Sequence, residues 1–346
     1  MKKKNVVNLI RYYAESNDAG FKNEAYEIAK GFDAMGDHQL AEYIMATLSD
    51  ANTFIPQSNE INSDFLSKVK LENEPLPLPD LIADDIKGLI NAIGHNAGIN
   101  RFLFEGAPGT GKTATAKQVA RLLNRELFVV DFSSVIDSRL GQTAKNIASL
   151  FSEINRFAHP EKAIILFDEI DALALDRTNS SDIREMGRAT SAVFKGFDGL
   201  SKYVVLIATT NLLNEFDKAL KRRFDSIISF DRYSQEDLLI VAEALLNRYL
   251  GMFKFAGRNM RLFRKIIRLM PSVPYPGELE NLIKTSLAFS SPQDEFDYLR
   301  RLFESQKSID PDDVAELQAL GFTVREIEVL TKRSKSSVAR ELREQL

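Results

Sequence analysis

The sequence predicts a mixed α/β fold in which a five-stranded parallel sheet carries helices on both faces. Three observations support this prediction. Short apolar runs recur through the middle of the chain, helical patterns separate most of them, and a glycine-rich turn follows the first run. Strands of a parallel sheet are apolar along their whole length because helices cover both faces. The predicted strands are residues 101–104, 127–131, 163–167, 204–208 and 226–230.

Helical patterns precede the sheet. We predict an N-terminal helical domain over residues 1–70. The apolar residues of "FKNEAYEIAKGFDAMGDHQLAEYIMATL" recur at helical spacing, with a break at Gly36 and Asp37. We therefore expect a helical hairpin. Residues 71–79 predict a proline-rich connector, because alternating prolines exclude both helix and central strand. The domain that holds the sheet is expected over residues 80–232.

Helical patterns also follow the sheet. Three of them fall within residues 233–308, which predict a helical subdomain, and Ser234 is the expected cap of its first helix. Residues 309–346 have the pattern of a helix-turn-helix, with Thr323 and Ser334 as expected N-caps. Residues 332–343 include five basic residues and a single acidic one. This pattern leaves two interpretations open, which are DNA contact through residues 323–343 and docking of a protein.

The composition excludes several classes of protein. The 346-residue chain contains no cysteine, which excludes a disulfide framework, a thiolate metal site and a cysteine nucleophile. Its histidines, His38, His95 and His159, are scattered, so no metal cluster is expected. No apolar run approaches the length of about 18 residues that a membrane span needs. The net charge of −4 gives no overall basic field. We expect a cytoplasmic protein that does not enter a membrane.

The glycine-rich turn "GAPGTGKT" fits the pattern G-x-x-x-x-G-K-[ST], directly after a strand and at the start of a helix. In this context the glycines let backbone N–H groups turn towards phosphate oxygens, and the helix N-terminus adds positive potential. Lys112 would reach the β- and γ-phosphates, and Thr113 would give its hydroxyl to Mg²⁺. The pattern therefore predicts a site for ATP and Mg²⁺ formed by Gly106, Ala107, Pro108, Gly109, Thr110, Gly111, Lys112, Thr113 and Ala114.

Polar residues end two of the later strands. "IILFDEID" places Asp168 and Glu169 directly after a buried strand, and "VVLIATTN" ends in Asn211. Asp168 is the expected second ligand of Mg²⁺ beside Thr113, and Glu169 is the expected general base for the attacking water. Asn211 would orient that water. Together these residues predict an enzyme that hydrolyses ATP.

Two arginines, Arg222 and Arg223, precede the last predicted strand. Unpaired cations are poorly placed there unless they meet an anion. The γ-phosphate bound by a neighbouring subunit is one such anion, because an arginine finger stabilises charge in the transition state. On these residues alone, a surface salt bridge is the alternative.

The segments "GAPGTGKT", "LFDEID", "FKGFDGL", "ATTN" and "KRRFD", in this order and spacing, resemble the AAA subgroup of the AAA+ ATPases over roughly residues 79–290. The resemblance implies a nucleotide-binding subdomain over residues 80–232 and a helical lid over residues 233–308. It also implies a homo-oligomeric ring, usually a hexamer, in which Arg222 and Arg223 act on the ATP of a neighbour. The adenine is expected near Asp80–Asp84.

Two positions depart from the family's pattern. In "YPGELENL", Gly277 and Glu280 stand where many members carry a lid arginine that senses the nucleotide. In "VIDSRLGQTAKNIASLF", Arg139, Leu140 and Gly141 stand where threading members place an aromatic residue, an aliphatic residue and glycine. A guanidinium can pair with phosphate or carboxylate, so this second departure weakens the case for polypeptide threading and gives some weight to an acidic or nucleic-acid ligand. A surface loop with one exposed arginine is the alternative.

The stretches "AYEIAKGFD", "GDHQLAEYIM" and "SDANTF", taken with the ATPase pattern that follows them, resemble the small stand-alone bacterial AAA ATPases found alongside subtilisin-like serine proteases. This resemblance implies a subtilisin-like protease as partner. We therefore expect a ring-forming ATPase that remodels or delivers a protein substrate. The alternative is a DNA-associated ATPase of the loader or partition type, which would use Arg139 and residues 323–343.

Overall fold

The computed structural model describes residues 3–15, 17–33, 35–38, 41, 44, 63–71, 76–95, 98–137, 141–157, 159–173, 182–213, 216, 218–306 and 313–344. The chain divides into two compact units, Met1–Asn62 and Ser63–Leu346. Each unit is described by itself below.

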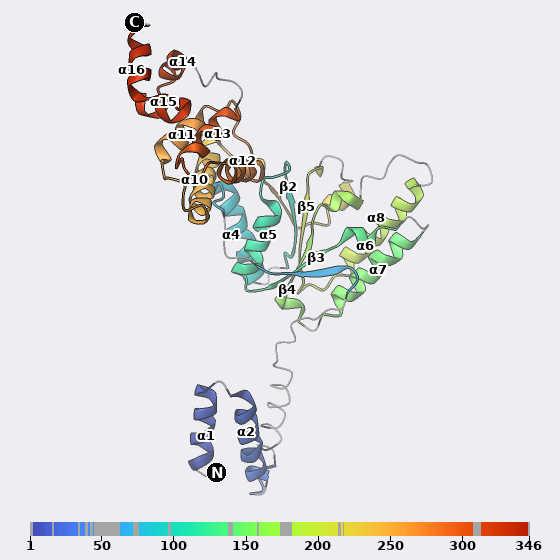
Figure 1. The fold of residues 1–346 in the computed structure, drawn as a ribbon. Helices are drawn as coiled ribbons and strands as arrows, with labels where there is room; N and C mark the ends of the chain where they lie inside the picture. The colour runs from blue at the N-terminus through green and yellow to red at the C-terminus, as the bar shows by residue number, and fades with distance from the viewer. Residues whose placement is uncertain are drawn as a thin grey trace. The chain divides into compact units, whose positions relative to one another are not determined.

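The N-terminal unit contains a pair of helices, α1 (Lys3–Ala14) and α2 (Asp18–Asp33), that lie side by side (Figure 1). Ala25 and Ala29 are buried on the inner face of α2, and the side chain of Asn8 donates a hydrogen bond to Glu24 at 3.0 Å. The first arm of the predicted hairpin corresponds to α2. Most of its second arm, in residues 39–50, lies outside the described residues.

The second unit is built on a six-stranded sheet. Its order is β1-β3-β4-β5-β2-β6, in which β1 is antiparallel to β3 and every other pair is parallel. Residues of β4 and β5 are buried along the whole strand, as the apolar runs predict. The strands are β1 (Leu66–Val69), β2 (Arg101–Glu105), β3 (Glu126–Val130), β4 (Ala163–Phe167), β5 (Val205–Thr210) and β6 (Ser226–Ser229).

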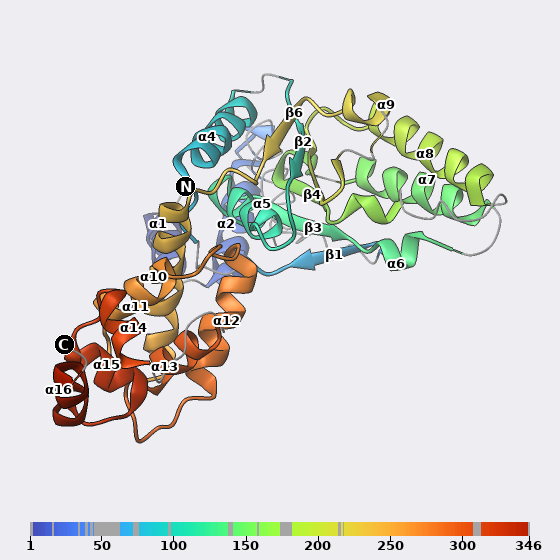
Figure 2. The same ribbon diagram turned by 90° about the horizontal axis from the view of Figure 1, so that it is seen from above.

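The mixed α/β fold class and the five predicted strands are confirmed, but the sheet has a sixth strand that the sequence does not predict. This strand, β1, lies beside β3 at the edge of the sheet, with Leu66 opposite Val130 (Figure 2). It falls within residues 1–70, where only helices are expected. The strand is four residues long and buries only Leu66, so it carries no apolar run that would indicate a strand.

Helices cover both faces of the sheet (Figure 1). On one face, Ile82 of α4 and Val119 of α5 share a core with Phe104 of β2. On the other face, Phe151 of α7 and Phe197 of α8 pack around Phe167 of β4 with ring centroids 5.7–6.0 Å apart. These helices are α4 (Asp80–Gly94), α5 (Lys112–Leu122), α7 (Gln142–Asn155) and α8 (Asp182–Asp198), and shorter ones are α6 (Phe132–Val135), α9 (Lys218–Lys221), η1 (Pro160–Lys162) and η2 (Ile170–Leu173).

The remainder of this unit is a helical subdomain with one continuous apolar core. That core runs from Leu238 of the first helix to Leu342 of the last. The predicted caps are confirmed, because the hydroxyls of Ser234, Thr323 and Ser334 accept hydrogen bonds from backbone N–H groups three residues on. The helices are α10 (Gln235–Met252), α11 (Met260–Arg268), α12 (Pro276–Ala288), α13 (Asp297–Glu304), α14 (Val314–Ala319), α15 (Val324–Thr331) and α16 (Lys335–Glu344).

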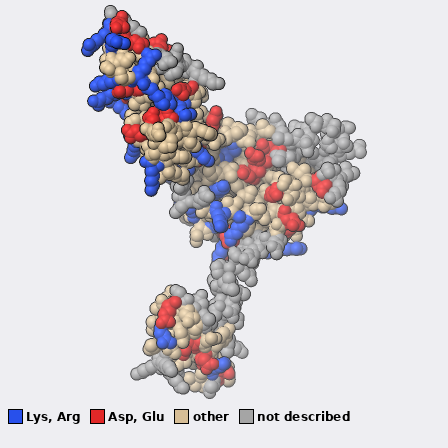
Figure 3. Space-filling model, in the orientation of Figure 1, with Lys and Arg blue, Asp and Glu red and all other residues tan. Residues whose placement is uncertain are grey.

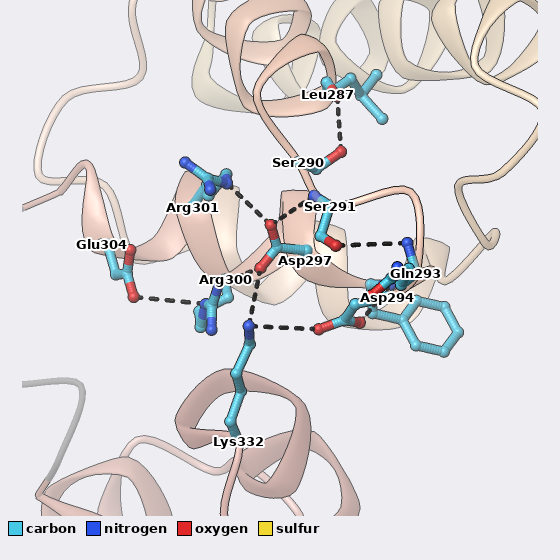
Figure 4. A network of polar contacts seen from close by, with 11 residues as sticks. Leu287, Ser290, Ser291, Gln293, Asp294, Asp297, Arg300, Arg301, Glu304 and Lys332 are labelled. Atoms are coloured by element: carbon cyan, nitrogen blue, oxygen red, sulfur yellow. Dashed lines mark hydrogen bonds and ion pairs between the residues drawn. The ribbon is translucent and has the colours of Figure 1, made fainter.

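A buried carboxylate joins α13 to the end of α15. The Asp297 side chain is 1% exposed and accepts hydrogen bonds from the Ser291 N–H and the Arg301 guanidinium, both at 2.9 Å. Lys332, which directly follows α15, lies 3.5 Å away, and Arg300 also contacts the carboxylate (Figure 4). Burial opposes ionisation, but these donors and cations outweigh it and lower the pKa of Asp297 to about 2. The helix-turn-helix segment is thus held to α13 by charge as well as by the apolar core.

In the part of the chain that the structure describes, no helix has the length and apolar character needed to cross a membrane.

Candidate active site

The predicted phosphate loop connects β2 to α5 and needs glycine at three turning points. Gly106, Gly109 and Gly111 have φ angles of 142°, 78° and 93°, in the left-handed region that side chains disfavour. A Cβ at Gly106 would also lie 3.0 Å from the Asp231 carboxylate, which accepts a hydrogen bond from the Ala107 N–H at 2.7 Å. The sequence pattern therefore matches a loop whose conformation glycine permits.

Lys112 begins α5 and points back into this loop. Its ammonium donates to the carbonyls of Gly106 and Ala107 at 2.7 and 2.8 Å and to the side-chain oxygen of Asn211 at 2.8 Å. Burial lowers the pKa of Lys112, against the attraction of nearby carboxylates, first among them Asp231. Two predicted site residues that are 99 positions apart in sequence are therefore in direct contact.

A second set of contacts joins the loop to the end of β4. The Thr113 hydroxyl donates to Asp168 at 2.7 Å, and the Thr209 hydroxyl donates to the same carboxylate oxygen at 2.8 Å. Thr209 also accepts a hydrogen bond from the Glu169 N–H at 2.8 Å. Thr209 is a functional candidate that the sequence does not single out. The sequence hints at a role for Thr209 only in that a hydroxyl-bearing residue stands near the end of an otherwise apolar run, two positions before Asn211.

Glu169 occupies an unusual turn. Its φ of 53° is left-handed, which is uncommon for a residue with a side chain and recurs at active sites. Glu169 is exposed, and among the described residues no donor pairs with its carboxylate. The nearby Asp171 is 5% exposed, and its Oδ1 has no hydrogen-bond partner in the described part of the chain. The Glu169 carboxylate and the Asp171 Oδ1 atom thus have no hydrogen-bond donor among the described residues.

The donor set fits a magnesium ion and a nucleotide. The Thr113 hydroxyl and the Asp168 carboxylate are hard oxygen ligands that meet at the end of the phosphate loop. Within the described residues, His, Asp and Glu side chains form no cluster of three or more that would hold a metal by themselves. A cation at this site would therefore need further oxygen ligands, such as those of a bound phosphate.

The helical subdomain contacts the phosphate loop through two hydrogen bonds. The Gly277 N–H, at the start of α12, donates to the Gly109 carbonyl at 2.8 Å, and the Tyr233 hydroxyl donates to the Thr110 carbonyl at 3.0 Å. Beside these contacts is a cleft of about 600 Å³. Asp80–Asp84, the residues expected near the adenine, do not line this cleft, which instead meets residues 69, 70, 76 and 78 ahead of α4.

Residues 102–232, which include all of these contacts at the sheet edge, match the family model described as "ATPase family associated with various cellular activities (AAA)". This segment is therefore similar to the AAA ATPases, and it is called the AAA domain below. An uncharacterised AAA family ATPase of Sinorhizobium fredii, y4kL, is 39% identical over 133 residues, which are 38% of this chain and 39% of that protein. The proteasome-activating nucleotidase of Methanoregula boonei is 37% identical over 145 residues, 40% of this chain and 33% of that one.

Wider comparisons extend beyond the AAA domain. The peroxisomal ATPase PEX6 of Dictyostelium discoideum is 30% identical over 195 residues, 55% of this chain and 15% of its own length. The chain therefore spans less than two-fifths of the length of each of these relatives. A chain of the E. coli MS115-1 HORMA:CdnC:Trip13 complex superposes with a TM-score of 0.55 at 18% identity, over 71% of this chain and 96% of that one. At this identity the match shows a shared fold.

The two arginines of the AAA domain differ in their surroundings. Arg223 pairs with Asp198 at 3.2 Å, donates to the Ala219 carbonyl at 2.9 Å and lies 4.1 Å from the centre of the Phe194 ring. Arg222 is exposed, and no acidic side chain among the described residues pairs with it. Neither arginine contacts Lys112 or the Asp168 carboxylate. Among the described residues, the salt bridge considered for this pair is therefore seen at Arg223 and not at Arg222.

The expected pore-loop positions Arg139 and Leu140 lie outside the described residues. Gly141 is described and caps the N-terminus of α7 with a φ of 79°.

Three of the five basic residues at positions 332–343 are paired with acids. Lys332 lies 3.5 Å from Asp297, Arg333 2.8 Å from Glu341, and Arg340 3.9 Å from Glu344. On the face shown in Figure 3, acidic side chains are interspersed among the Lys and Arg of this region. These pairs reduce the positive charge that the sequence pattern offers to DNA, because a phosphate would compete with an existing carboxylate partner.

Proposed function

We propose that this protein is a Mg²⁺-dependent ATPase that assembles into a homo-oligomeric ring, with six subunits, and remodels or delivers a protein substrate. The observation that carries the proposal is the meeting of Lys112, Thr113, Asp168 and Asn211 at one edge of the sheet. The four residues come from three separate motifs, and each belongs to the chemistry of phosphate-anhydride hydrolysis.

In this proposal the chain's own groups divide the work. Backbone N–H groups of the phosphate loop and Lys112 bind the β- and γ-phosphates of ATP, and Thr113 and Asp168 hold the metal. Bound Mg²⁺ would neutralise charge on the phosphate oxygens. Glu169 takes the proton from the attacking water, and Asn211 orients that water. The Thr209 hydroxyl fixes the left-handed turn that presents Glu169.

Assembly is supported by the position of the arginines. Arg222 is exposed, and no acidic side chain among the described residues pairs with it, so its guanidinium is accessible to an anion from outside the subunit. We infer that Arg222 and Arg223 act on the ATP that is bound by a neighbouring subunit. A ring would place one such arginine at each nucleotide.

A protein substrate is supported by the names of the relatives, which include a proteasome-activating nucleotidase and a putative 26S proteasome regulatory subunit homolog. We retain the subtilisin-like serine protease as the proposed partner, on the resemblance of the N-terminal stretches. The absence of cysteine fits a reducing compartment, and we place the protein in the cytoplasm.

The test is steady-state ATP hydrolysis at a protein concentration that permits assembly, with unfolded polypeptide or duplex DNA added separately. Glu169→Gln serves as the blank, and we expect it to bind ATP while losing about 10²- to 10⁴-fold in hydrolysis. Stimulation by polypeptide alone supports the proposal. Stimulation by DNA alone would replace it with a DNA-associated ATPase, and near-native turnover of Glu169→Gln would remove the assigned base.

A further inference from the structure

A second cleft, of about 270 Å³, lies at the end of the sheet opposite the phosphate loop. The phosphate loop follows the carboxyl end of β2, whereas this cleft is lined by residues that come before strands. They are Asn100 before β2, Arg125 before β3, Glu161 before β4 and Tyr203 before β5. Because these four strands are parallel, their amino ends meet at one end of the sheet. The cleft is therefore separate from the proposed nucleotide site.

Arg125 brings a hydrogen-bond donor without a partner to this cleft. Its Nη1 atom is buried, and no acceptor in the described part of the chain pairs with it. The carboxylate of Glu161 lies instead 3.3 Å from Nδ1 of His159. Burial lowers the pKa of Arg125 against the attraction of Glu161, but a guanidinium stays charged in proteins. A buried donor without an acceptor costs free energy, so Arg125 indicates a ligand that supplies the acceptor.

The charges that line the cleft fit an anion with a single charge. Among the described lining residues, Arg125 and Lys202 are cationic and Glu161 is anionic, which leaves an excess of one positive charge. Lys202 is exposed, and its ammonium lies 5.2 Å from the centre of the Tyr203 ring. A phosphate monoester brings close to two negative charges, and Glu161 would repel the second. A carboxylate brings one charge and matches the excess.

The remaining lining fits an apolar group attached to that carboxylate. Two large side chains with apolar surface, Ile99 and Tyr203, are 38% and 52% exposed, so they present this surface to solvent. The cleft is larger than one water molecule requires, and it has room for a small organic group. The aliphatic side chains of the lining are Ala92, Ile93, Ile99 and Val205.

We propose that this cleft binds a carboxylate that is carried by a short apolar group. The Arg125 guanidinium donates hydrogen bonds to the carboxylate, and Lys202 adds positive charge. The aliphatic side chains of the lining contact the apolar group. Arginine suits this role because its planar N–H donors match the two oxygens of a carboxylate. Free organic acids and the C-terminal residue of a polypeptide share this chemistry. The inference does not depend on the proposed ATPase function.

The test is isothermal titration calorimetry of the full-length protein with isocaproate, a carboxylate on a leucine-like chain. Isocaproamide, its neutral counterpart, should bind at least about tenfold more weakly, because it gives Arg125 no charged acceptor. Acetate should also bind at least about tenfold more weakly, because it lacks most of the apolar group. Equal affinities for isocaproate and isocaproamide, or no binding of isocaproate and of the peptide acid described below at millimolar concentrations, would overturn the proposal.

A pair of tripeptides that end in leucine distinguishes the two sources of the carboxylate. One peptide has a free C-terminal carboxylate, and the other has a C-terminal amide. Binding of the peptide acid, with no binding of the peptide amide, supports the proposal and identifies a polypeptide C-terminus as a ligand. Binding of isocaproate without binding of the peptide acid supports the proposal and identifies a free organic acid.

The variant Arg125→Met removes the guanidinium and keeps an unbranched side chain. We expect isocaproate affinity to fall at least about tenfold and the unfolding midpoint without ligand not to fall, because the buried donor is removed. Wild-type affinity for isocaproate in this variant would overturn the proposal. The matched control is Arg156→Met, because Arg156 is exposed at the end of α7 and does not line the cleft. It should bind isocaproate as the wild type does.

A second variant decides the outcome if Arg125→Met is destabilised or does not fold. Lys202→Gln changes an exposed side chain of the lining, so we expect the fold to be kept. Its affinity for isocaproate should fall severalfold while its affinity for isocaproamide stays unchanged, because only the acid interacts with the lost charge. Unchanged affinity for isocaproate would then overturn the proposal.

Discussion

The contact between α12 and the phosphate loop can be tested with one methyl group. In Gly277→Ala, the new Cβ would lie 3.0 Å from the Cα of Gly109 and 3.4 Å from its carbonyl oxygen. Carbon atoms in contact prefer a separation of about 3.5–4.0 Å, so the two backbones must move apart by roughly 0.5–1 Å. Overpacking of this kind costs about 1–3 kcal/mol, and the better helix propensity of alanine offsets up to about 1 kcal/mol.

With the full offset, the remaining strain of up to about 2 kcal/mol corresponds to a loss of ADP affinity of up to about 30-fold if the helical subdomain yields by moving away from the loop. Calorimetric titration with ADP measures this loss. Gly251→Ala is the control, because Gly251 lies in α10 of the same subdomain and a Cβ there meets nothing within 4 Å. We expect Gly251→Ala to bind ADP normally. ADP affinity of Gly277→Ala equal to that of Gly251→Ala would refute the reasoning that this contact shapes the site.

Three further predictions follow from individual contacts. Thr209→Val keeps the side-chain shape but leaves the Glu169 N–H without its acceptor. We therefore expect the free energy of unfolding to fall by about 1–3 kcal/mol, and ATP hydrolysis to be lost to a greater extent than ADP binding. Hydrolysis at the wild-type rate would contradict this. Arg222→Ala should abolish the rise of specific ATPase activity with protein concentration and leave the thermal midpoint unchanged. Arg223→Ala should abolish that rise and also lower the midpoint, because it breaks the pair with Asp198. A wild-type concentration dependence in both variants would exclude action in trans. Asp297 has its pKa lowered from 3.8 to about 2, so its stabilisation of about 2 kcal/mol is present above pH 3.8 and is lost as the pH falls towards 2. The difference in unfolding midpoint between wild type and Asp297→Asn should therefore shrink over that interval, and a constant difference would show that ionisation of Asp297 does not contribute.

The central strands and the phosphate loop could be predicted from the sequence because their signals are local. β4 and β5 are buried along their whole length, so each is a continuous apolar run, and the loop's glycines are required by its own backbone angles. The edge strand β1 has no such signal. It is half exposed and pairs with β3, whose residues follow about 60 positions later, so only the assembled sheet makes it a strand.

The sequence indicates the candidate site residues motif by motif and predicts that Thr113 and Asp168 lie together, but it does not predict the contact through Thr209. Asp168 and Lys112 follow from motifs, but the bridge through Thr209 depends on β4 and β5 being neighbours in the sheet. The same limit applies to charge. Five basic residues in a short stretch suggest a positive face, yet acids from α13 and from later turns of α16 neutralise part of it. Counting charges along a chain does not show which of them meet across helices.

The continuous core of the helical subdomain has a mechanical consequence. α12 begins at the phosphate loop, packs on α13, and is joined through α13 and α15 to α16. Because close-packed cores deform little, we expect these helices to move together when α12 moves relative to the phosphate loop. A tilt of α12 at the loop would therefore move the C-terminal helix, and whatever α16 holds would be carried with it.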